Sequence, residues 1–438
     1  MDEQENNLNE EQDQKFEFIT ETIKEKPISK KRILIKILFT LFLAVLFGVV
    51  AAFSLLISKP YMEAKLYPEE PKKVEIPRGE EQEEEAEEPK QEPVVVEKEP
   101  VVTQIVEKVE KVELEIDDYK KLNDQFYSLA KESEKSIVTV TGVSSNVDWF
   151  MNAYENENQT SGMIIADNGK ELLILANKAV LESAERIQVT FCDATESAGE
   201  IKKYDANTGL VIVAVDLSTI SEETMATIKP AEYGNKKASE LLGIPIIAIG
   251  NPLGYSGSVA LGNITSNSYV MNMEDTSMQL ITTDIYGSKS GSGIIIDLDG
   301  KVLGIISQDS VGNDNVNLLK AYAITDLITT IEKLSNGQDI AYLGIKGTDV
   351  TEAVTEEVGV PMGAYVMEVI MDSPAMQVGI QSGDVIVKMG TTDILSFEDY
   401  KAAMMKSQPG DLMMITVKRQ GKEGYIDLPY EVELGKLE

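Results

Sequence analysis

The chain has 438 residues, enough for two or three domains, and its 74 acidic residues outnumber 40 basic ones to give a formal net charge of -34. This balance argues against nucleic acid as a partner, because phosphate binding requires a basic surface. The chain contains no histidine, which excludes a Ser-His-Asp triad and removes the commonest nitrogen ligand of zinc.

A hydrophobic segment follows a polar amino-terminal tail. Residues 1–29 are rich in Glu, Asn and Gln and are predicted to be a disordered tail. The 22 residues from Ile37 to Ser58 carry no charge and match the roughly 20 that a helix needs to cross a bilayer. Four basic residues precede them: Lys30, Lys31, Arg32 and Lys36. The positive-inside rule therefore predicts a signal-anchor helix over 33–58 in a cell membrane, with 1–29 in the cytoplasm and the main domains on the extracytoplasmic side.

A cleaved signal peptide is the alternative interpretation of this segment. Its hydrophobic region would span about 7–15 residues behind a short basic start. The segment is longer and follows a long acidic tail, which favours an uncleaved anchor. A core helix of a soluble domain does not fit, because no face of the segment is polar.

Residues 60–116 are dominated by Glu, Pro, Lys and Val, as in EEQEEEAEEPKQEPVVVEKEP. Such a composition buries too little apolar surface to fold, so we predict an extended, self-repelling linker. A specific acidic docking site is the less common alternative.

Ordered structure is predicted to begin near Asp117, where DYKKLNDQFYSLAKESEK has helical spacing. Short strand-like runs follow, among them SIVTVTGV, SGMIIAD, ELLILAN, RIQVTF, LVIVAVDL, IPIIAIG, SMQLITTD, GIIID and KVLGIIS. Turn residues such as DNGK, NPLG and DLDG separate them, which predicts an all-β barrel or sandwich over about 137–335. A helix in AITDLITTIEKLSNG closes this region at Gly337. The single cysteine, Cys192, is predicted to be a small buried side chain at the end of a strand.

A second, smaller unit spans about 342–434. It contains the strand-like runs GAYVMEV, VIVKMG, LMMITVKR and YIDLPYEVE, and helix-like runs in SPAMQVG and SFEDYKAAMMKSQ. This order predicts a mixed α+β module. No group of acidic residues has a spacing that predicts a metal site, and DLDG (297–300) is predicted to be a hairpin turn rather than a calcium loop.

The order of these segments resembles the HtrA/Deg family of envelope serine proteases. The motifs that carry the resemblance are IAIGNPLG (247–254), SVALGNITS (258–266), TTD (282–284), DLDGKVLGI (297–305) and SPAMQVGIQSGDVIVKMG (373–390). The resemblance implies a mostly β fold, with a chymotrypsin-like double β-barrel over 117–338 and a small α+β PDZ domain over 340–436. One transmembrane helix would precede them.

The catalytic positions of that family are occupied here by other residues. By resemblance, Lys178 in ILANKAVLESAERI stands at the position of the histidine. Gly209 in GLVIVAVDL stands at the position of the aspartate, and neither Asp205 nor Asp216 fits that register.

Two residues are candidates for the position of the family's catalytic serine. Counting forward from Asp284 reaches Ser292, whereas counting back from Gly300 reaches Gly291, so both Ser290 and Ser292 are candidates. An oxyanion hole needs two backbone N–H groups directed at one point, and neither serine has the glycine two residues earlier that eases this turn. The sequence therefore predicts no intact catalytic triad. The alternative is a serine–lysine enzyme in which a desolvated Lys178 is the base.

The second module is predicted to bind peptides by adding them to a sheet edge. By resemblance, the loop that holds the terminal carboxylate is Tyr342, Leu343, Gly344 and Ile345. The helix in SFEDYKAAMMKSQ would form the opposite wall, with Tyr400, Met404 and Met405 as candidate pocket residues. Each of these three residues is also compatible with a purely structural place in the core.

Together these patterns predict a membrane-anchored, catalytically inactive HtrA-like protein without cofactors. Its expected partners are unfolded or carboxyl-terminal peptide segments and envelope proteins, and the resemblance adds a homo-trimer as an open alternative. An active endopeptidase that uses the serine–lysine pair is the second hypothesis. A structural envelope scaffold is the third.

Overall fold

The computed structural model describes residues 38, 39, 41–48, 51, 54, 71–76, 115–147, 153–308 and 317–437. The chain divides into two compact units, Met1–Glu70 and Pro71–Glu438. In the first unit the described residues all belong to the predicted anchor, and they are helical. Within the described parts of the chain, no helix is both long enough and apolar enough to cross a membrane. The tail 1–29 and the rest of the predicted anchor lie outside the described residues.

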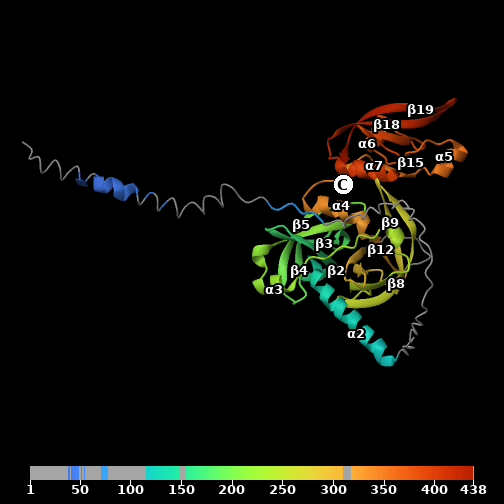
Figure 1. Cartoon of the computed structure of the whole chain (residues 1–438). Coiled ribbons are helices and arrows are strands. Elements are labelled where there is room, and N and C mark those ends of the chain that lie inside the picture. The colour runs from blue at the N-terminus through green and yellow to red at the C-terminus, as the bar shows by residue number, and fades with distance from the viewer. Residues whose placement is uncertain are drawn as a thin grey trace, which may run out of the picture. The chain divides into compact units, whose positions relative to one another are not determined.

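Six antiparallel strands form a first closed barrel in the order β1-β2-β3-β6-β5-β4. Of these, β2 to β5 are labelled in Figure 1. The strands are β1 (Ile137–Val147), β2 (Ala153–Asp167), β3 (Glu171–Asn177), β4 (Arg186–Thr190), β5 (Glu196–Tyr204) and β6 (Leu210–Asp216). Strands β3 and β6 are almost continuously apolar, because both of their faces are buried. Short helical segments flank or join the strands: η1 (Glu134–Ser136) before β1, η2 (Lys178–Val180) between β3 and β4, and η3 (Leu217–Thr219) and α3 (Glu222–Thr227) after β6.

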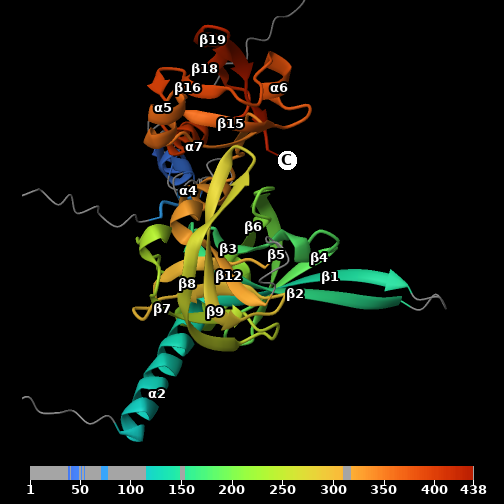
Figure 2. The ribbon, with the colours of Figure 1, turned by 90° about the vertical axis from the view of Figure 1, so that its right-hand side faces the viewer.

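A second closed barrel has the order β10-β11-β12-β9-β8-β7. Its strands are β7 (Pro245–Asn251), β8 (Ser258–Met273), β9 (Thr276–Tyr286), β10 (Ser292–Ile296), β11 (Val302–Ile306) and β12 (Leu318–Ala323), with η4 (Ala238–Glu240) before them. Strands β8 and β9 form a long ribbon, which is yellow in Figure 2. The predicted turn DLDG joins β10 to β11, where the Gly300 N–H donates to the Asp297 carbonyl oxygen at 3.1 Å.

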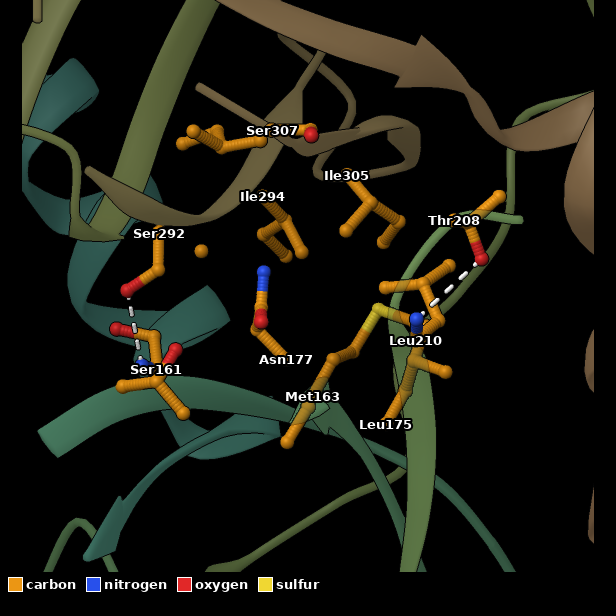
Figure 3. Close-up of a pocket in the computed structure, with 14 residues that line it drawn as sticks. Ser161, Met163, Leu175, Asn177, Thr208, Leu210, Ser292, Ile294, Ile305 and Ser307 are labelled. Atoms are coloured by element: carbon orange, nitrogen blue, oxygen red, sulfur yellow. Dashed lines mark hydrogen bonds between the residues drawn. The ribbon is translucent and has the colours of Figure 1, made fainter. Parts of the chain in front are cut away.

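Three apolar clusters explain why the two barrels form one domain. One cluster fills the first barrel, with Leu172 and Ile174 of β3 among its members, and another fills the second barrel. The third cluster combines Leu173 and Leu175, on the opposite face of β3, with residues of β7, β9 and β10. Alternate residues of a strand face opposite sides, so each barrel supplies apolar side chains both to its own interior and to the region between the barrels. Figure 3 shows Leu175 of the first barrel and Ile294 of the second at a cavity in this region. Helices α2 (Ile116–Ser133) and α4 (Ile324–Ser335) also contribute to this shared core.

The carboxyl-terminal module is built on a sheet of order β14-β15-β16-β18-β19, with β17 beside β16 and a separate β13–β20 pair. The strands are β13 (Ala341–Tyr342), β14 (Ile345–Asp349), β15 (Ala364–Val369), β16 (Val385–Met389), β17 (Thr392–Asp393), β18 (Leu412–Gly421), β19 (Gly424–Glu433) and β20 (Gly435–Lys436). The helices are α5 (Glu352–Val358), α6 (Pro374–Val378) and α7 (Phe397–Lys406). Strand β14 lies at an edge of the sheet, and α7 packs beside it. This matches the arrangement expected for a PDZ module.

Most predicted elements are confirmed, and the differences have local causes. The helix expected from Asp117 is α2, the closing helix is α4, and Gly337 adopts a φ of 70° just after α4 ends. Strands β5, β8 and β12 were not among the predicted runs. The prediction of a buried Cys192 is wrong, because β4 ends at Thr190 and the cysteine lies exposed in the following turn.

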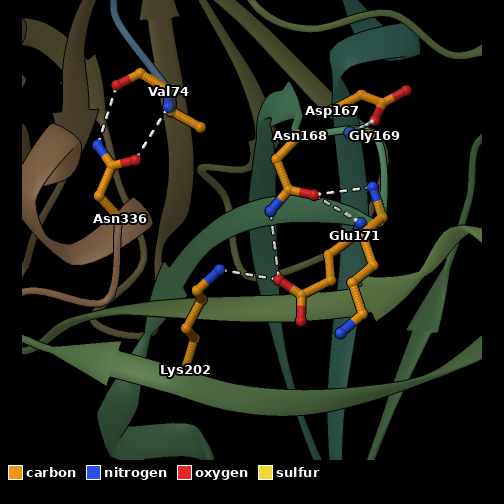
Figure 4. Close-up of polar contacts among 8 residues, drawn as sticks. Val74, Asp167, Asn168, Gly169, Glu171, Lys202 and Asn336 are labelled. Atoms are coloured by element: carbon orange, nitrogen blue, oxygen red, sulfur yellow. Dashed lines mark hydrogen bonds and ion pairs between the residues drawn. The ribbon is translucent and has the colours of Figure 1, made fainter. Parts of the chain in front are cut away.

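Part of the predicted linker, residues 71–76, lies against the barrels. Val74 and Ile76 are only 7% and 6% exposed. The Asn336 side chain accepts from the Val74 N–H and donates to its carbonyl oxygen, both at 2.9 Å (Figure 4). The Lys72 N–H donates to the Asn168 carbonyl oxygen at 2.9 Å, in the β2–β3 turn that a Glu171–Lys202 ion pair of 2.8 Å also braces. This short segment therefore differs from the solvated linker that its composition predicted.

Candidate functional site

A small cavity lies between the barrels, and Ser292, one of the two candidate catalytic serines, lines it (Figure 3). Its volume is about 20 Å³. That is room for about one water molecule, whereas ligand pockets commonly measure roughly 300–1,000 Å³. None of the described residues that line the cavity is ionisable. Of the four predicted catalytic positions, only Ser292 is among them.

Ser292 opens β10 and is 9% exposed. Its Oγ accepts a hydrogen bond of 3.0 Å from the backbone N–H of Ser161, across the boundary between the barrels. The side chain of Asn177, the last residue of β3, lines the same cavity. A nucleophilic serine needs an adjacent base, and here the bond to Oγ comes from an amide donor. The surroundings of Ser292 are thus those of a buried structural serine.

Lys178 is directed toward other groups. Its Nζ lies 3.8 Å from the centroid of the Tyr204 ring and 3.9 Å from Glu182 Oε1. The Lys178 side chain is 31% exposed. A lysine that is to act as a base must be desolvated and must reach the serine, whereas Nζ of Lys178 contacts a π face and a carboxylate.

Gly209 lies in the β5–β6 turn with a φ of 67°. Its carbonyl oxygen accepts from the Lys178 N–H at 2.7 Å, so the two positions adjoin through their backbones. The nearby Asp205 is buried and accepts from the Thr208 N–H and hydroxyl, which closes the turn, and burial raises the pKa of Asp205. Asp216 caps η3 by accepting from the Ser218 N–H. Both carboxylates therefore stabilise local backbone structure.

The loop that carries Ser290 is closed by bonds within itself. The Ser290 N–H donates to Ser288 Oγ at 3.3 Å, and the Gly291 N–H donates to the Ser288 carbonyl oxygen at 2.9 Å. Ser290 is exposed, and its Oγ lies 3.0 Å from Ser288 Oγ. An oxyanion hole needs N–H groups left unbonded and directed at one point. The two amides of this turn already have intramolecular acceptors.

The predicted carboxylate loop contains three backbone donors that converge on one carboxylate. The N–H groups of Leu343, Gly344 and Ile345 donate to the side chain of Asp275 at 2.7, 2.8 and 3.0 Å. Gly344 has a φ of 86°, and a Cβ there would lie 2.2 Å from Ser373 Cβ, so glycine is required. Three of the four residues predicted for the carboxylate loop are thus brought together around a carboxylate.

The predicted pocket residues of α7 differ in their positions. Tyr400 is fully buried, stacks on Phe397 with 5.3 Å between ring centroids, and donates from its hydroxyl to Asp275 Oδ1 at 2.6 Å. Burial raises the pKa of Tyr400 and also that of Asp275, although four donors stabilise the ionised carboxylate. Met404 is 3% exposed and belongs to the core of the module.

Sequence reasoning missed Asp275, the partner of the PDZ loop, and also Ser161 and Asn177. Asp275 belongs to the turn MEDT between two strands, a pattern typical of many hairpins. Its partners are 68 to 125 residues away in the chain, so no local signal indicates them. Ser161 was visible only as one residue of the strand-like run SGMIIAD.

Comparisons with known proteins agree with both modules. Residues 160–305 match the trypsin-like peptidase domain, and residues 341–429 match the PDZ domain. Serine protease Do-like HtrB of Bacillus subtilis is 29% identical over 60% of this chain and 60% of its own length. Serine protease Do-like HtrA of Lactococcus lactis subsp. lactis is 25% identical over 77% of this chain and 84% of its own.

A third relative, from Pseudomonas putida, is named a probable periplasmic serine endoprotease DegP-like and is 27% identical over 63% of this chain. The chain spans only 60% and 56% of the lengths of the Bacillus and Pseudomonas proteins. Among solved structures, the HtrA-type protease AlgW with decapeptide superimposes with a TM-score of 0.52 at 18% identity, over 71% of this chain and 98% of its own. At that identity the likeness supports the fold. With the two domain matches, their order and these relatives, the chain belongs to the HtrA family of trypsin-like peptidases with a PDZ domain.

Proposed function

We propose that this protein is a peptide-binding HtrA-family member whose trypsin-like domain does not hydrolyse peptide bonds. The observation that carries the proposal is the convergence of three PDZ-loop amides on a carboxylate. Backbone nests of this kind capture the terminal carboxylate of a peptide that is added to an edge strand. Strand β14, which begins at Ile345, is such an edge.

The lack of hydrolysis is supported by the chain's own chemistry. There is no histidine, and Gly209 occupies the position that resemblance assigns to the catalytic aspartate. Lys178 is engaged by Tyr204 and Glu182. Without a base to accept the serine proton, attack on a carbonyl carbon is slow even where a serine is accessible.

We expect the purified full chain to show neither fluorophosphonate labelling nor cleavage of unfolded casein. A fluorophosphonate probe reacts with serines whose hydroxyl is activated, so an unactivated Ser290 or Ser292 stays unmodified. Labelling is measured by in-gel fluorescence and cleavage by release of acid-soluble peptides. An active HtrA-type protease in the same assay provides the positive control.

Three variants decide between this proposal and the serine–lysine endopeptidase. Labelling of the full chain that disappears in Ser290→Ala or Ser292→Ala, and also in Lys178→Met, would overturn the proposal and assign an active endopeptidase. Lys202→Met is the matched control, because it removes a lysine whose partner, Glu171, belongs to the start of β3 and not to the serine loop.

Peptide binding is expected to depend on a free terminal carboxylate. Fluorescein-labelled peptides that end in Val, Leu or Phe should bind the full chain, and the same peptides with an amidated end should bind at least tenfold more weakly. The reason is that amidation removes the charge that the three amides hold. Fluorescence anisotropy gives the two dissociation constants. Equal affinities for the acid and amide forms would contradict capture through the carboxylate loop.

The location and assembly are proposed on separate grounds. We propose that residues 33–58 form a single-pass membrane anchor with 1–29 in the cytoplasm, supported by the uncharged run 37–58 and the preceding basic residues. The bound partners would then be peptide segments or envelope proteins on the extracytoplasmic side. Alkaline extraction of cell membranes tests the anchor, because a spanning helix stays in the pellet. A homo-trimer is the assembly implied by the family, and sedimentation of the purified full chain tests it.

A further inference from the structure

The β8–β9 ribbon of the second barrel ends in a tight turn, Glu274–Asp275, at the tip of the long hairpin seen in Figure 2. Asp275 adopts a φ of 57°, a left-handed conformation that only a few residue types take readily. The residue is 7% exposed, although turn residues at hairpin tips normally lie in water. Aspartate tolerates this φ, but the burial of its carboxylate requires a compensating interaction.

That interaction is with the carboxylate loop of the PDZ domain. Asp275 Oδ2 accepts from the N–H groups of Leu343 and Gly344, and Oδ1 accepts from the N–H of Ile345 and from the Tyr400 hydroxyl. The backbone N–H of Asp275 in turn donates to the Ile345 carbonyl oxygen at 2.7 Å. The four donors satisfy both oxygens of a buried carboxylate.

This pattern is the one that the end of a bound peptide would make. A terminal carboxylate needs the amides of the loop, and the last peptide N–H needs the first carbonyl group of the edge strand β14. Asp275 supplies both, with a side-chain carboxylate in place of a terminal one. We propose that Asp275 is an internal ligand of the PDZ carboxylate loop, so that a peptide binds only after the β8–β9 tip has left. This inference rests on the peptide-binding function proposed above.

The tip is held by neighbouring contacts as well. The Asn207 side chain, from the β5–β6 turn of the first barrel, accepts from the Glu274 N–H at 3.2 Å and donates to the Glu274 carbonyl oxygen at 2.9 Å. On the other side of the tip, Lys401 Nζ donates to the Ser277 carbonyl oxygen at 3.0 Å. The occupied state is therefore favoured over the open state. The apparent affinity for a peptide then falls by the fraction of molecules in which the loop is open.

Two substitutions weaken or remove the internal ligand without breaking the hairpin turn. Asp275→Asn keeps the size of the side chain and tolerates a positive φ, but it brings an amide group against backbone donors. Asp275→Gly also tolerates a positive φ and removes the side chain entirely. We expect both variants of the full chain to bind the free-carboxylate peptides at least tenfold more tightly than the unmodified chain. The matched control is Asp299→Asn, an exposed hairpin-turn aspartate between β10 and β11, which should leave the affinity unchanged.

Hydrogen exchange measured by mass spectrometry provides a readout that does not depend on the peptide. In the unmodified chain the amides of Leu343, Gly344 and Ile345 should be protected, and in Asp275→Gly they should exchange faster. Saturating peptide should restore the protection of these amides in Asp275→Gly. In the unmodified chain it should speed exchange at Asp275, whose N–H would lose the Ile345 carbonyl group.

The outcomes separate this inference from the function on which it rests. If the unmodified chain binds peptide as tightly as both variants, or if loop exchange is the same in Asp275→Gly, the internal ligand is refuted and peptide binding stands. If neither the unmodified chain nor either variant binds any peptide, the proposed function is refuted. In that case faster loop exchange in Asp275→Gly would identify the contact as a structural clasp between domains.

Discussion

Replacing Gly293 by alanine is expected to lower the free energy of unfolding of the second barrel by about 3–5 kcal/mol. Gly293 has a φ of 120°, which side chains of L-residues rarely permit. A Cβ at this position would lie 2.1 Å from the Ile249 carbonyl oxygen, a backbone atom of the paired strand β7. Either β10 or β7 must move, and both are buried in the centre of the domain.

The close approach at Gly293 also explains the geometry around the predicted serine. Gly250 is its partner in the β7–β10 pair and has a φ of 110°. A Cβ on Gly250 would lie 2.8 Å from Ser161 Oγ. Because Gly250 and Gly293 have no side chains, strands β7 and β10 can approach each other and strand β2 closely. This approach brings the Ser161 N–H within hydrogen-bonding distance of Ser292 Oγ.

Hydrogen exchange of the β7 and β10 amides in the full chain measures this effect, because it reports the opening of one region in a protein with several folded units. Gly257→Ala is the matched control. Gly257 also has a positive φ, 74°, but a Cβ there meets nothing within 4 Å. Gly257→Ala should lower the free energy of unfolding only by the cost of placing alanine in the left-handed conformation, about 1–2 kcal/mol. Equal effects of the two substitutions would show that the contact with Ile249 contributes nothing.

The barrels could be predicted from sequence because their strands are short, apolar and bounded by turn residues. Two of the strands that escaped prediction, β5 and β8, are less apolar than the others. Strand β5 reads ESAGEIKKY, in which polar residues predominate, because much of this strand is exposed. Strand β8 has many exposed or half-buried residues along the projecting ribbon. Hydrophobic periodicity follows burial, so it fails where a strand extends beyond the core.

The candidate catalytic residues show a second limit. The sequence placed Lys178 at the position of a missing histidine, but it could not predict where the side chain points. Its aromatic partner, Tyr204, is at the end of the unpredicted strand β5. The prediction of a solvated linker missed residues 71–76 for a related reason. The alternation of Val74 and Ile76 is a strand-like signal, and the surrounding Glu, Pro and Lys residues outweighed it.

The carboxylate loop shows a third limit, which concerns pairs of distant residues. Its position was predicted by resemblance, and Gly344 is the only part that local chemistry explains. The occupant, Asp275, belongs to another domain and carries no motif. An aspartate in a turn is normally exposed, and Asp275 is buried only because the tertiary structure brings the carboxylate loop against it.

Replacing Arg419 by methionine is expected to destabilise the PDZ domain by about 3–5 kcal/mol. Arg419 forms a bidentate ion pair with Asp384, in which Nε donates to Oδ1 at 2.6 Å and Nη2 donates to Oδ2 at 2.7 Å. Arg419 also donates to the Gly379 carbonyl oxygen at 2.8 Å. The Asp384 side chain is 1% exposed, so methionine at 419 would leave a buried carboxylate without its counter-charge.

The loss of stability in Arg419→Met should arise from burying the unpaired Asp384 carboxylate rather than from losing the ion-pair attraction itself. A second variant separates these two causes. Asp384→Asn combined with Arg419→Met buries no ionised group, so we expect it to be at least about 1 kcal/mol more stable than Arg419→Met alone. Lys418→Met is the control, because the Lys418–Asp427 pair joins a half-buried lysine to an exposed aspartate and should contribute less than about 1 kcal/mol. Exchange of the β16 and β18 amides in the full chain measures all three variants.

The Arg419 result also bears on peptide binding through the architecture of the sheet. Asp384 lies in the turn whose backbone pairs with Val366 of β15, and β15 is the partner of the edge strand β14. Loss of the ion pair should therefore loosen the strand that holds the carboxylate loop in place. Arg419→Met should weaken peptide binding even in combination with Asp275→Gly, whereas Lys418→Met should not. Unchanged affinity in that combination would mean that the loop keeps its geometry independently of the sheet behind it.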